Sequence, residues 1–430
     1  MLNKVLNTFS IKFTSALINL LMAILISRYL HASGKGAQSI ILTTISFILI
    51  FANIAGGATL VYLTPRFKVS ILVITSYLWS LIVGVLSYLI LKITNLVDAN
   101  FIIHICILSV INSFGAINAN ILLGREKIIS SNIVNFVQPV ITVLSLLIFI
   151  FIFKNTNVSI YIYALYFAYV ISFIISILLI KTDLIDFFKI KITEFKEVLK
   201  SMFNYGFYNQ LGHVTQFLNF RISYYLLNSY HGEKSLGIYS NGVSLTEAIW
   251  LVSGSMAMVQ YSKIVNTNDW KYSQQLTINL TKISILITLI AIIPMVLLPS
   301  EFYAFIYTKE FGSINHIMLC LAPGVLVYNL ALLTMHYFSG TGRYYINTLA
   351  SFYGLIVTGL LGFWAIPKYG IYGAALVASC SYIVTSIVAF YYFRKDSGIK
   401  IVALLPNLND ITYYIKTIKD IFTKKSDHVK

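Results

Sequence analysis

Three polar residues that could bind a ligand fall on one face of a strongly apolar segment in the middle of the chain. Asn209, His213 and Gln216 follow the spacing i, i+4, i+7, which places them within an arc of about 60° on an α-helix. Gln210 and Arg221 flank that arc. Amide and imidazole groups both donate and accept hydrogen bonds, and a helix with such a stripe cannot face lipid. The pattern therefore indicates a wet, ligand-binding cavity.

Two titratable residues in apolar segments leave more than one interpretation open. His213 could be a structural histidine, a proton carrier or a substrate contact. Glu247 could neutralise Arg221, or it could bind and release the ion that drives a transport cycle. Both are functional candidates because burying an ionisable group at membrane depth is costly.

Further polar residues lie on other apolar segments. Lys12 and Arg28 would, with Arg221, give the cavity a positive potential that stabilises an anionic substrate at low dielectric. Because Lys12 and Arg28 lie near the ends of their segment, they could instead extend to the interface. The residues predicted to bind substrate are Arg28, Arg221, Lys12, Asn19, Asn112, Asn209, His213 and Gln216, and Glu247 is the candidate for ion coupling.

Motifs of the common enzyme and cofactor classes are absent from the sequence. It contains no Walker A motif, no HExxH and no DxD. Cys106, Cys320 and Cys380 lie far apart inside apolar runs, so we predict neither a metal site nor a disulfide. The sequence thus predicts no cofactor and no enzymatic activity.

These residues must be positioned by helices in a membrane. The chain is 58% hydrophobic and only 11% charged, with a mean hydropathy of +0.81. A soluble chain carries about 25% charge. Twelve segments reach the roughly 20 apolar residues that a spanning helix needs: 9–30, 37–63, 69–93, 100–123, 128–153, 158–180, 202–228, 236–261, 275–299, 313–338, 344–366 and 369–393. The predicted fold is all-α and integral to the membrane, with two six-helix lobes around a central cavity.

Lysine and arginine positions predict the orientation. In a soluble protein, the net charge of +16 would suggest nucleic acid as a partner, but here the cations lie between the apolar segments. With a cytoplasmic N-terminus, 23 of the 31 lysines and arginines face the cytoplasm and seven face the other side. This bias obeys the positive-inside rule and puts both termini in the cytoplasm. We predict membrane lipids as partners and no nucleic acid.

The cation-rich stretches also divide the chain. Residues 1–180 are predicted to form the N-terminal lobe, 181–200 a cytoplasmic linker, 201–393 the C-terminal lobe and 394–430 a basic cytoplasmic tail. In the tail, apolar residues from 408 to 422 recur at helical spacing opposite lysines, which favours an amphipathic helix on the inner leaflet. A disordered tail is the alternative.

The two halves resemble each other. Gly36 and Ser39 open the second segment as Gly237 and Ser240 open the eighth, at an offset of 201. A Gly-Arg pair closes the fourth segment at 124–125 and the tenth at 342–343. A parallel repeat of six helices is typical of carriers that move two lobes around a central cavity. Chance similarity between apolar sequences is the alternative.

Several short motifs resemble those of bacterial polysaccharide flippases. These are ISRYL at 26–30, GKG at 34–36 and GG at 56–57 in the first half. In the second half they are LGIYS at 236–240 followed by Glu247, and IPKYGIYGAA at 366–375. The chain departs from the family at His31, where a glycine is usual, and at Ile222 and Ser223, where an acidic residue is often found.

The resemblance covers about residues 5 to 393 and implies a Wzx-type flippase of the multidrug/oligosaccharidyl-lipid/polysaccharide superfamily. Such proteins move undecaprenyl-diphosphate-linked oligosaccharide repeat units to the outer leaflet of the bacterial inner membrane. There the units are used for O-antigen, lipopolysaccharide or capsule synthesis. The resemblance also implies a polysaccharide polymerase and a chain-length regulator as partners, and it assigns a cavity role to Arg28.

Two other functions stay open. One is a multidrug or cation antiporter of the same superfamily, although cationic substrates require buried acids and Glu247 is the one clear acid within a segment. The other is a membrane enzyme such as a polysaccharide polymerase or ligase. The short loops predicted on the outer side oppose it, because such enzymes need a substantial outer loop with charged catalytic residues.

Overall fold

The computed structural model describes residues 2–181, 192–404 and 406. Within these residues every regular element is helical. The elements are α1 (Leu2–Tyr29), α2 (His31–Ala52), η1 (Asn53–Ala55), α3 (Gly57–Leu63), α4 (Val69–Thr94), α5 (Ala99–Gly124), α6 (Ile128–Leu147), η2 (Ile148–Ile152), α7 (Ser159–Ile180), α8 (Ile192–Val265), α9 (Trp270–Leu297), α10 (Ser300–Ile306), η4 (Lys309–Phe311), α11 (Ile314–Gly340), α12 (Tyr344–Ser397) and η5 (Ile401–Leu404).

The helices account for about twelve membrane crossings, as predicted. Nine helical segments of the described chain are long and apolar enough to cross a membrane. Two of these, in α8 and α12, reverse direction at a glycine with non-helical backbone angles, Gly232 (φ 75°, ψ 176°) and Gly370 (φ 56°, ψ −130°). Each therefore supplies two crossings. The apolar part of α1, Phe13–Tyr29, supplies one more.

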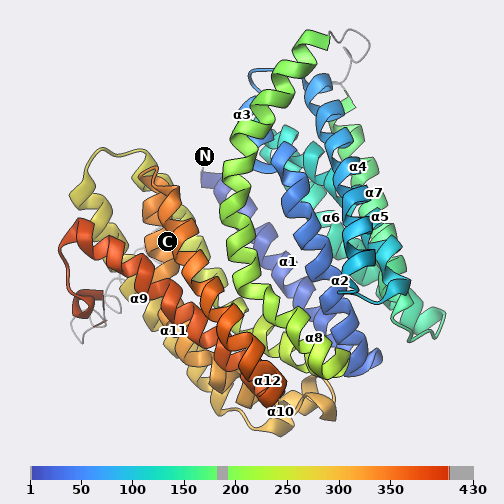
Figure 1. The fold of residues 1–430 in the computed structure, drawn as a ribbon, viewed down its shortest axis with the longest axis vertical. Helices are drawn as coiled ribbons and strands as arrows, with labels where there is room; N and C mark the ends of the chain where they lie inside the picture. The colour runs from blue at the N-terminus through green and yellow to red at the C-terminus, as the bar shows by residue number, and fades with distance from the viewer. Residues whose placement is uncertain (1, 182–191, 405, 407–430) are drawn as a thin grey trace, which may run out of the picture.

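The crossings form two lobes that converge at one end and separate at the other (Figure 1). The N-terminal lobe contains α1 to α7. The C-terminal lobe contains α8 to α12, and α8 packs against α2 and η1 on one side and against α11 and α12 on the other. We call the end where α7 ends and α8 begins the inner end, following the predicted orientation. The opposite end, where the lobes converge, is the outer end.

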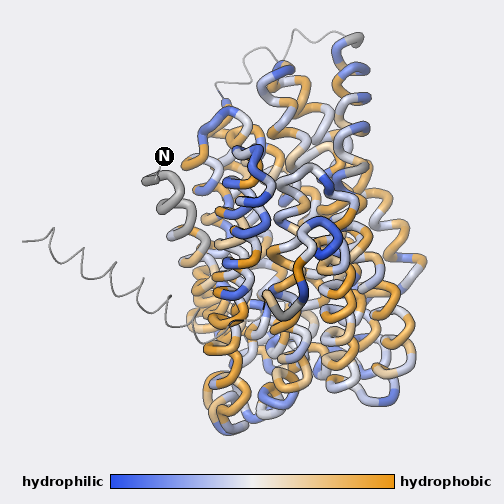
Figure 2. Tube along the Cα trace, turned by 90° about the vertical axis from the view of Figure 1, so that its left-hand side faces the viewer, coloured by the Kyte–Doolittle hydropathy of each residue, from blue (hydrophilic) through white to orange (hydrophobic). Residues whose placement is uncertain are grey.

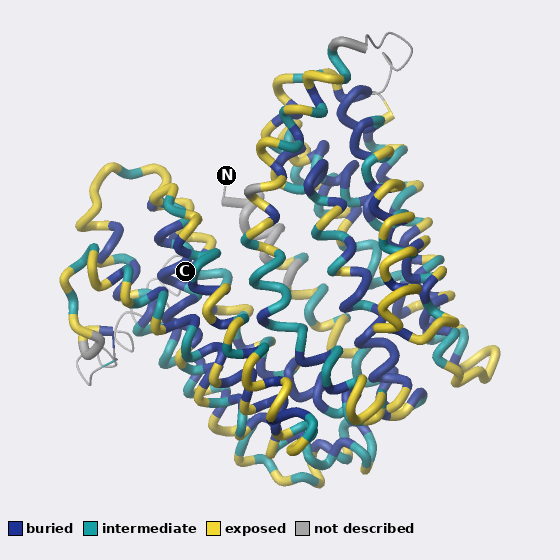
Figure 3. Tube along the Cα trace, viewed as in Figure 1, coloured by how far each residue is buried: buried dark blue, intermediate teal, exposed yellow. Residues whose placement is uncertain are grey.

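The surface of the bundle suits a lipid environment. Hydrophobic residues form a broad band across the helices in Figure 2, and buried residues run through the inside of each lobe in Figure 3. Large apolar side chains such as Ile93, Leu297 and Phe305 are about 80% exposed to the surroundings of the protein. In water such a surface would be costly, whereas in a bilayer it faces hydrocarbon.

The two lobes touch at the outer end through a close crossing of α2 and α8. The Ser39 hydroxyl donates to the Ser240 hydroxyl at 2.8 Å. A Cβ atom on Gly36 would lie 1.8 Å from the Glu233 carbonyl oxygen, and one on Gly237 would lie 1.9 Å from the carbonyl oxygen of Ala32. The two serines are 201 positions apart, and so are the two glycines, which is the predicted offset. The two helices therefore cross through equivalent positions of the predicted repeat.

Two predicted segments lie partly or wholly outside the described residues. Positions 182–191 of the predicted linker are among them, and α8 already begins at Ile192, inside that linker. The amphipathic helix predicted for residues 408–422 is also outside, so it stays a prediction.

Candidate substrate cavity

The first half of α8 separates two cavities inside the bundle. The larger has a volume of about 820 Å³ and lies between α8, α11 and α12. The smaller, of about 450 Å³, lies between α8 and the α2–η1–α3 segment. Both are lined by the predicted stripe of Asn209, His213 and Gln216, together with Phe220. The prediction that this face lines a cavity therefore agrees with the geometry.

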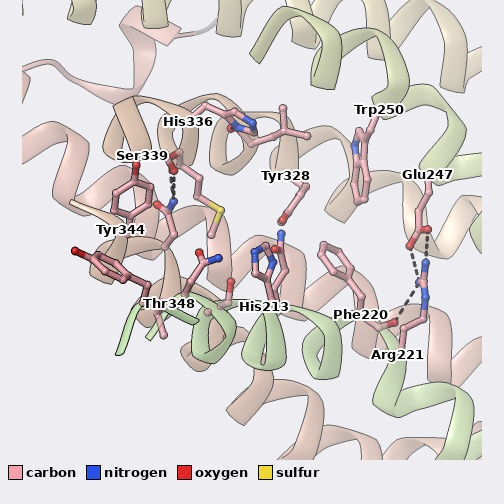
Figure 4. Close-up of a pocket in the computed structure, with 18 residues that line it drawn as sticks. His213, Phe220, Arg221, Glu247, Trp250, Tyr328, His336, Ser339, Tyr344 and Thr348 are labelled. Atoms are coloured by element: carbon pink, nitrogen blue, oxygen red, sulfur yellow. Dashed lines mark hydrogen bonds and ion pairs between the residues drawn. The ribbon is translucent and has the colours of Figure 1, made fainter. Parts of the chain in front are cut away.

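The stripe presents unused hydrogen-bonding groups to this space. Asn209 and His213 are exposed, and neither side chain makes a hydrogen bond within the described part of the chain. Neighbouring Gln210 instead points toward η1, where its amide donates to the Asn53 carbonyl oxygen at 3.4 Å. In Figure 4, His213 and Phe220 project from α8 toward Tyr328 and His336 on the opposite wall.

Arg221 and Glu247 close the far end of the larger cavity as an ion pair. The two guanidinium nitrogens donate to the two carboxylate oxygens at 2.8 and 2.7 Å. The side chains are 25% and 23% exposed, and the Arg221 guanidinium also lies over the Tyr224 ring at 5.1 Å. A bidentate pair fixes both groups and cancels their charges. Arg221 therefore does not provide the cavity with a free positive charge.

Aromatic rings surround this ion pair. Phe220, Trp250, Tyr328 and Tyr382 form one cluster with ring centroids 4.7 to 6.1 Å apart. The Trp250 indole donates to the Val325 carbonyl oxygen at 3.1 Å, which fixes its orientation. The deep part of the cavity thus has rigid aromatic walls.

Arg28 lies at the outer end, away from both cavities. Its guanidinium donates to the Ile306 carbonyl oxygen at 2.7 Å and to that of Phe305, at the end of α10. Beside it, a Glu310 carboxylate oxygen accepts from the Ala32 amide at 2.9 Å, and the other pairs with Lys234 at 3.0 Å. We call the contacts of Arg28 with Phe305 and Ile306 and of Glu310 with Ala32 the outer seam, because they join the two lobes.

The remaining predicted residues also lie away from the cavities. Asn112 accepts a hydrogen bond from Gln138 at 2.9 Å, between α5 and α6. Asn19 is exposed on α1 and lines neither cavity. The side chain of Lys12 lies outside the described residues. The described part of α1 therefore lines neither cavity, although Lys12, Asn19 and Arg28 were predicted to bind substrate.

Sequence reasoning missed the wall formed by α11 and α12. A periodic signal was present, because the lining residues of each helix follow helical spacing. They are Tyr328, Leu332, Met335, His336 and Ser339 on α11, and Tyr344, Asn347, Thr348 and Ser351 on α12. The i, i+3, i+4, i+7 spacing from Tyr344 to Ser351 is as regular as that of the α8 stripe.

We compared the chain with known proteins by sequence and by structure. No family model matches the chain. The capsular polysaccharide biosynthesis protein CapF of Staphylococcus aureus is 28% identical over 207 residues, which are 47% of this chain. The match spans about half the length of that relative, 51%.

Solved structures match over nearly the whole chain. The lipid II flippase MurJ in an inward closed conformation has a TM-score of 0.74 at 16% identity, covering 98% of this chain and 99% of that one. A multidrug resistance MATE family transporter of the MOP superfamily in an inward-facing conformation has a TM-score of 0.71 at 15% identity, covering 89% and 94%. An outward-facing MATE transporter has a TM-score of 0.65 at 17% identity, covering 94% and 96%. The chain thus has a multi-span membrane fold, and that fold is the one found in transporters of the MOP superfamily.

Proposed function

We propose that this protein is a flippase for lipid-linked oligosaccharides. It would move undecaprenyl-diphosphate-linked repeat units from the cytoplasmic to the outer leaflet of the bacterial inner membrane for O-antigen or capsule synthesis. The observation that carries the proposal is the character of the larger cavity. Its volume of about 820 Å³ suits a polar group of several sugars, and it lies between the first half of α8, which packs against α2 and η1 of the N-terminal lobe, and the helices α11 and α12.

The lining chemistry favours a glycan as the group that enters this cavity. Asn209, His213 and Asn347 offer uncharged donors and acceptors, as recognition of sugar hydroxyls requires. Trp250 and Tyr328 offer flat apolar faces against which a pyranose ring can pack. The ion pair at the far end has no net charge. A cavity with this lining suits an uncharged, hydroxyl-rich ligand better than a charged one.

The same lining weakens the antiporter alternative. A cationic drug needs an acidic residue that is free to neutralise it. Glu247 is the acid that lines the described cavities, and it is held by Arg221 through two hydrogen bonds. Its role as an ion-coupling residue remains part of the proposal and depends on whether the pair opens during transport.

The relatives support the choice of cargo. One is described as a capsular polysaccharide biosynthesis protein and another as a lipid II flippase. We accordingly propose that the isoprenoid chain stays in the bilayer while the head group moves between the lobes, with both termini in the cytoplasm. A polysaccharide polymerase and a chain-length regulator would then act on the product. Lys12 and Asn19 keep a proposed role only if α1 moves toward the cavity in another state.

The proposal can be tested by genetic complementation. In a strain that makes lipid-linked repeat units but lacks its own repeat-unit flippase, expression of this chain should restore surface polysaccharide and remove the accumulated repeat units. Continued accumulation of repeat units by a strain with verified membrane expression would contradict the proposal. Reduced retention of a cationic dye in the same strain would favour the antiporter.

A further inference from the structure

The arginines around the cavities differ in whether their charge is already neutralised. Arg221 is bound to Glu247. Arg343, next to the cavity at the start of α12, is paired with Asp396. Arg28 is engaged with carbonyl oxygens at the outer end. These three positions therefore offer little to an anionic ligand that enters from the inner end.

Arg66 differs from these three. It follows α3 at the inner end, is exposed, and makes no ion pair with any described residue. Its guanidinium carbon lies 3.7 Å from the centroid of the Tyr62 ring, and one nitrogen donates to the Tyr62 carbonyl oxygen. A guanidinium group has five N–H donors in a fixed plane, so most of them remain available. Stacking on the ring holds that plane in place.

The platform under Arg66 connects it to the cavity. The Tyr62 ring lies 4.7 Å from the Tyr205 ring, and their hydroxyl groups are 3.3 Å apart. Tyr205 lines the larger cavity, while Gly57 and Ala58, on the same helix as Tyr62, line the smaller one. The adjacent Tyr62 and Tyr205 rings therefore connect Arg66 to the rim of the larger cavity.

The position matches the depth of a lipid head group. Arg66 lies between two helices that can span the membrane, α2–α3 and α4, at the inner end. The phosphate groups of a lipid in the inner leaflet lie at that level, just outside the hydrocarbon core. A planar guanidinium group can bind two phosphate oxygens through a fixed pair of N–H donors, whereas a lysine ammonium group acts as a point charge.

We propose that Arg66 is a docking site for the phosphate or diphosphate group of the lipid-linked substrate at the mouth of the cavity. The inference rests on the proposed flippase function and assigns the two parts of the substrate to separate sites. The charged head group binds to the N-terminal lobe at the rim, and the uncharged glycan enters the cavity beside α11 and α12.

The test measures binding of farnesyl diphosphate, a water-soluble polyprenyl diphosphate, to the full chain in nanodiscs of zwitterionic lipid. Arg66→Ala should weaken binding by about tenfold or more, the usual size of a lost charge-assisted contact. Arg66→Lys should recover part of the affinity. Lys68→Gln is the matched control, because Lys68 loses the same charge two residues away but is already paired with Glu194 at 3.3 Å. It should bind within about twofold of wild type, since exposed pairs contribute little.

Competitors distinguish the sources of the anion. If inorganic diphosphate displaces bound farnesyl diphosphate as well as prenyl diphosphates do, the site binds the free anion. If only prenyl diphosphates displace it, the site binds the head group of the lipid. Equal displacement by phosphatidylglycerol would overturn the proposal, because Arg66 would then contact bulk anionic lipid. Equal affinity of wild type and Arg66→Ala would also overturn it and leave the flippase function intact. Failure of the wild type to bind any prenyl diphosphate would also overturn the docking site, whereas the flippase function is tested separately by the complementation assay. A thermal unfolding curve checks that Arg66→Ala is folded, and Arg66→Gln serves as a second variant.

Discussion

The Arg221–Glu247 pair allows a test of whether its charges serve stability or transport. Both side chains are about three-quarters buried and share two hydrogen bonds. Removing one partner of a fully buried pair costs about 3–5 kcal/mol, because the other charge is left without compensation. Since these side chains keep about a quarter of their exposure, we expect Glu247→Gln and Arg221→Gln each to cost about 2–4 kcal/mol.

The double variant separates the alternatives. With both charges removed, no uncompensated charge remains, and the loss should be smaller than the sum of the two single losses by about 2 kcal/mol, a typical coupling between contacting residues. Unfolding by denaturant in detergent, followed by tryptophan fluorescence, measures all four proteins. Strict additivity of the two losses would refute the reasoning, because it would mean that the two groups do not interact in the folded state.

Transport by the double variant then decides the role of Glu247. If Glu247 serves only to neutralise Arg221, the stable double variant should restore surface polysaccharide in the complementation assay. If Glu247 binds a coupling ion, the same variant should fold but fail to transport. The single variant Arg221→Gln gives the matched comparison, because it keeps Glu247 and frees it from its partner.

Three further predictions follow from the packing. Gly36→Ala should destabilise the protein by about 1–3 kcal/mol, because the new Cβ overlaps a carbonyl oxygen of α8. Gly359→Ala is the control in the same unfolding assay, because nothing lies within 4 Å of a Cβ at that position. Equal stability of the two variants would argue against the close crossing of α2 and α8. Glu310→Gln should weaken the outer seam, since it removes a charge-assisted hydrogen bond. Distances between spin labels placed on the two lobes at the outer end should then lengthen. An unchanged distribution of these distances would count against the seam. Trp250→Ala should reduce polysaccharide export about threefold to tenfold by loss of an aromatic contact, whereas Trp364→Ala, 62% exposed on the outside of the bundle, should not.

Much of the fold could be predicted because its signal is local. Each spanning helix needs a long apolar run, and such a run is visible in the sequence without knowledge of its neighbours. The stripe on α8 was visible for the same reason, since its spacing depends only on the helical repeat. The reversals at Gly232 and Gly370 fall where the sequence divides two apolar runs.

The site residues were harder to predict because their roles depend on distant partners. Arg28 and its carbonyl partners are more than 270 positions apart in the chain, and no local sequence pattern predicts that contact. Lys35 is one of the seven cations that the predicted orientation puts on the outer side, but it is 5% exposed inside the N-terminal lobe, where it donates to Gln38 at 2.6 Å. Whether a cation is free or neutralised is a property of the tertiary structure, and it decides which arginine can bind an anion.

The outer seam bears on how a substrate could drive the lobes apart. A ligand shifts a two-state equilibrium only by the difference between its affinities for the two states, and a shift from 99:1 to 1:99 requires about 5.5 kcal/mol. The seam contains a few charge-assisted hydrogen bonds of Arg28 and Glu310. Each such bond contributes about 1.5–3 kcal/mol when it is shielded from water and less when exposed. Lys234 is 63% exposed, so its pair with Glu310 adds little. Breaking the outer seam therefore costs a free energy of the same order as a few hydrogen bonds. A glycan that gains that many hydrogen bonds when the lobes close on it at the inner end would offset this part of the cost of opening, to which the α2–α8 crossing adds.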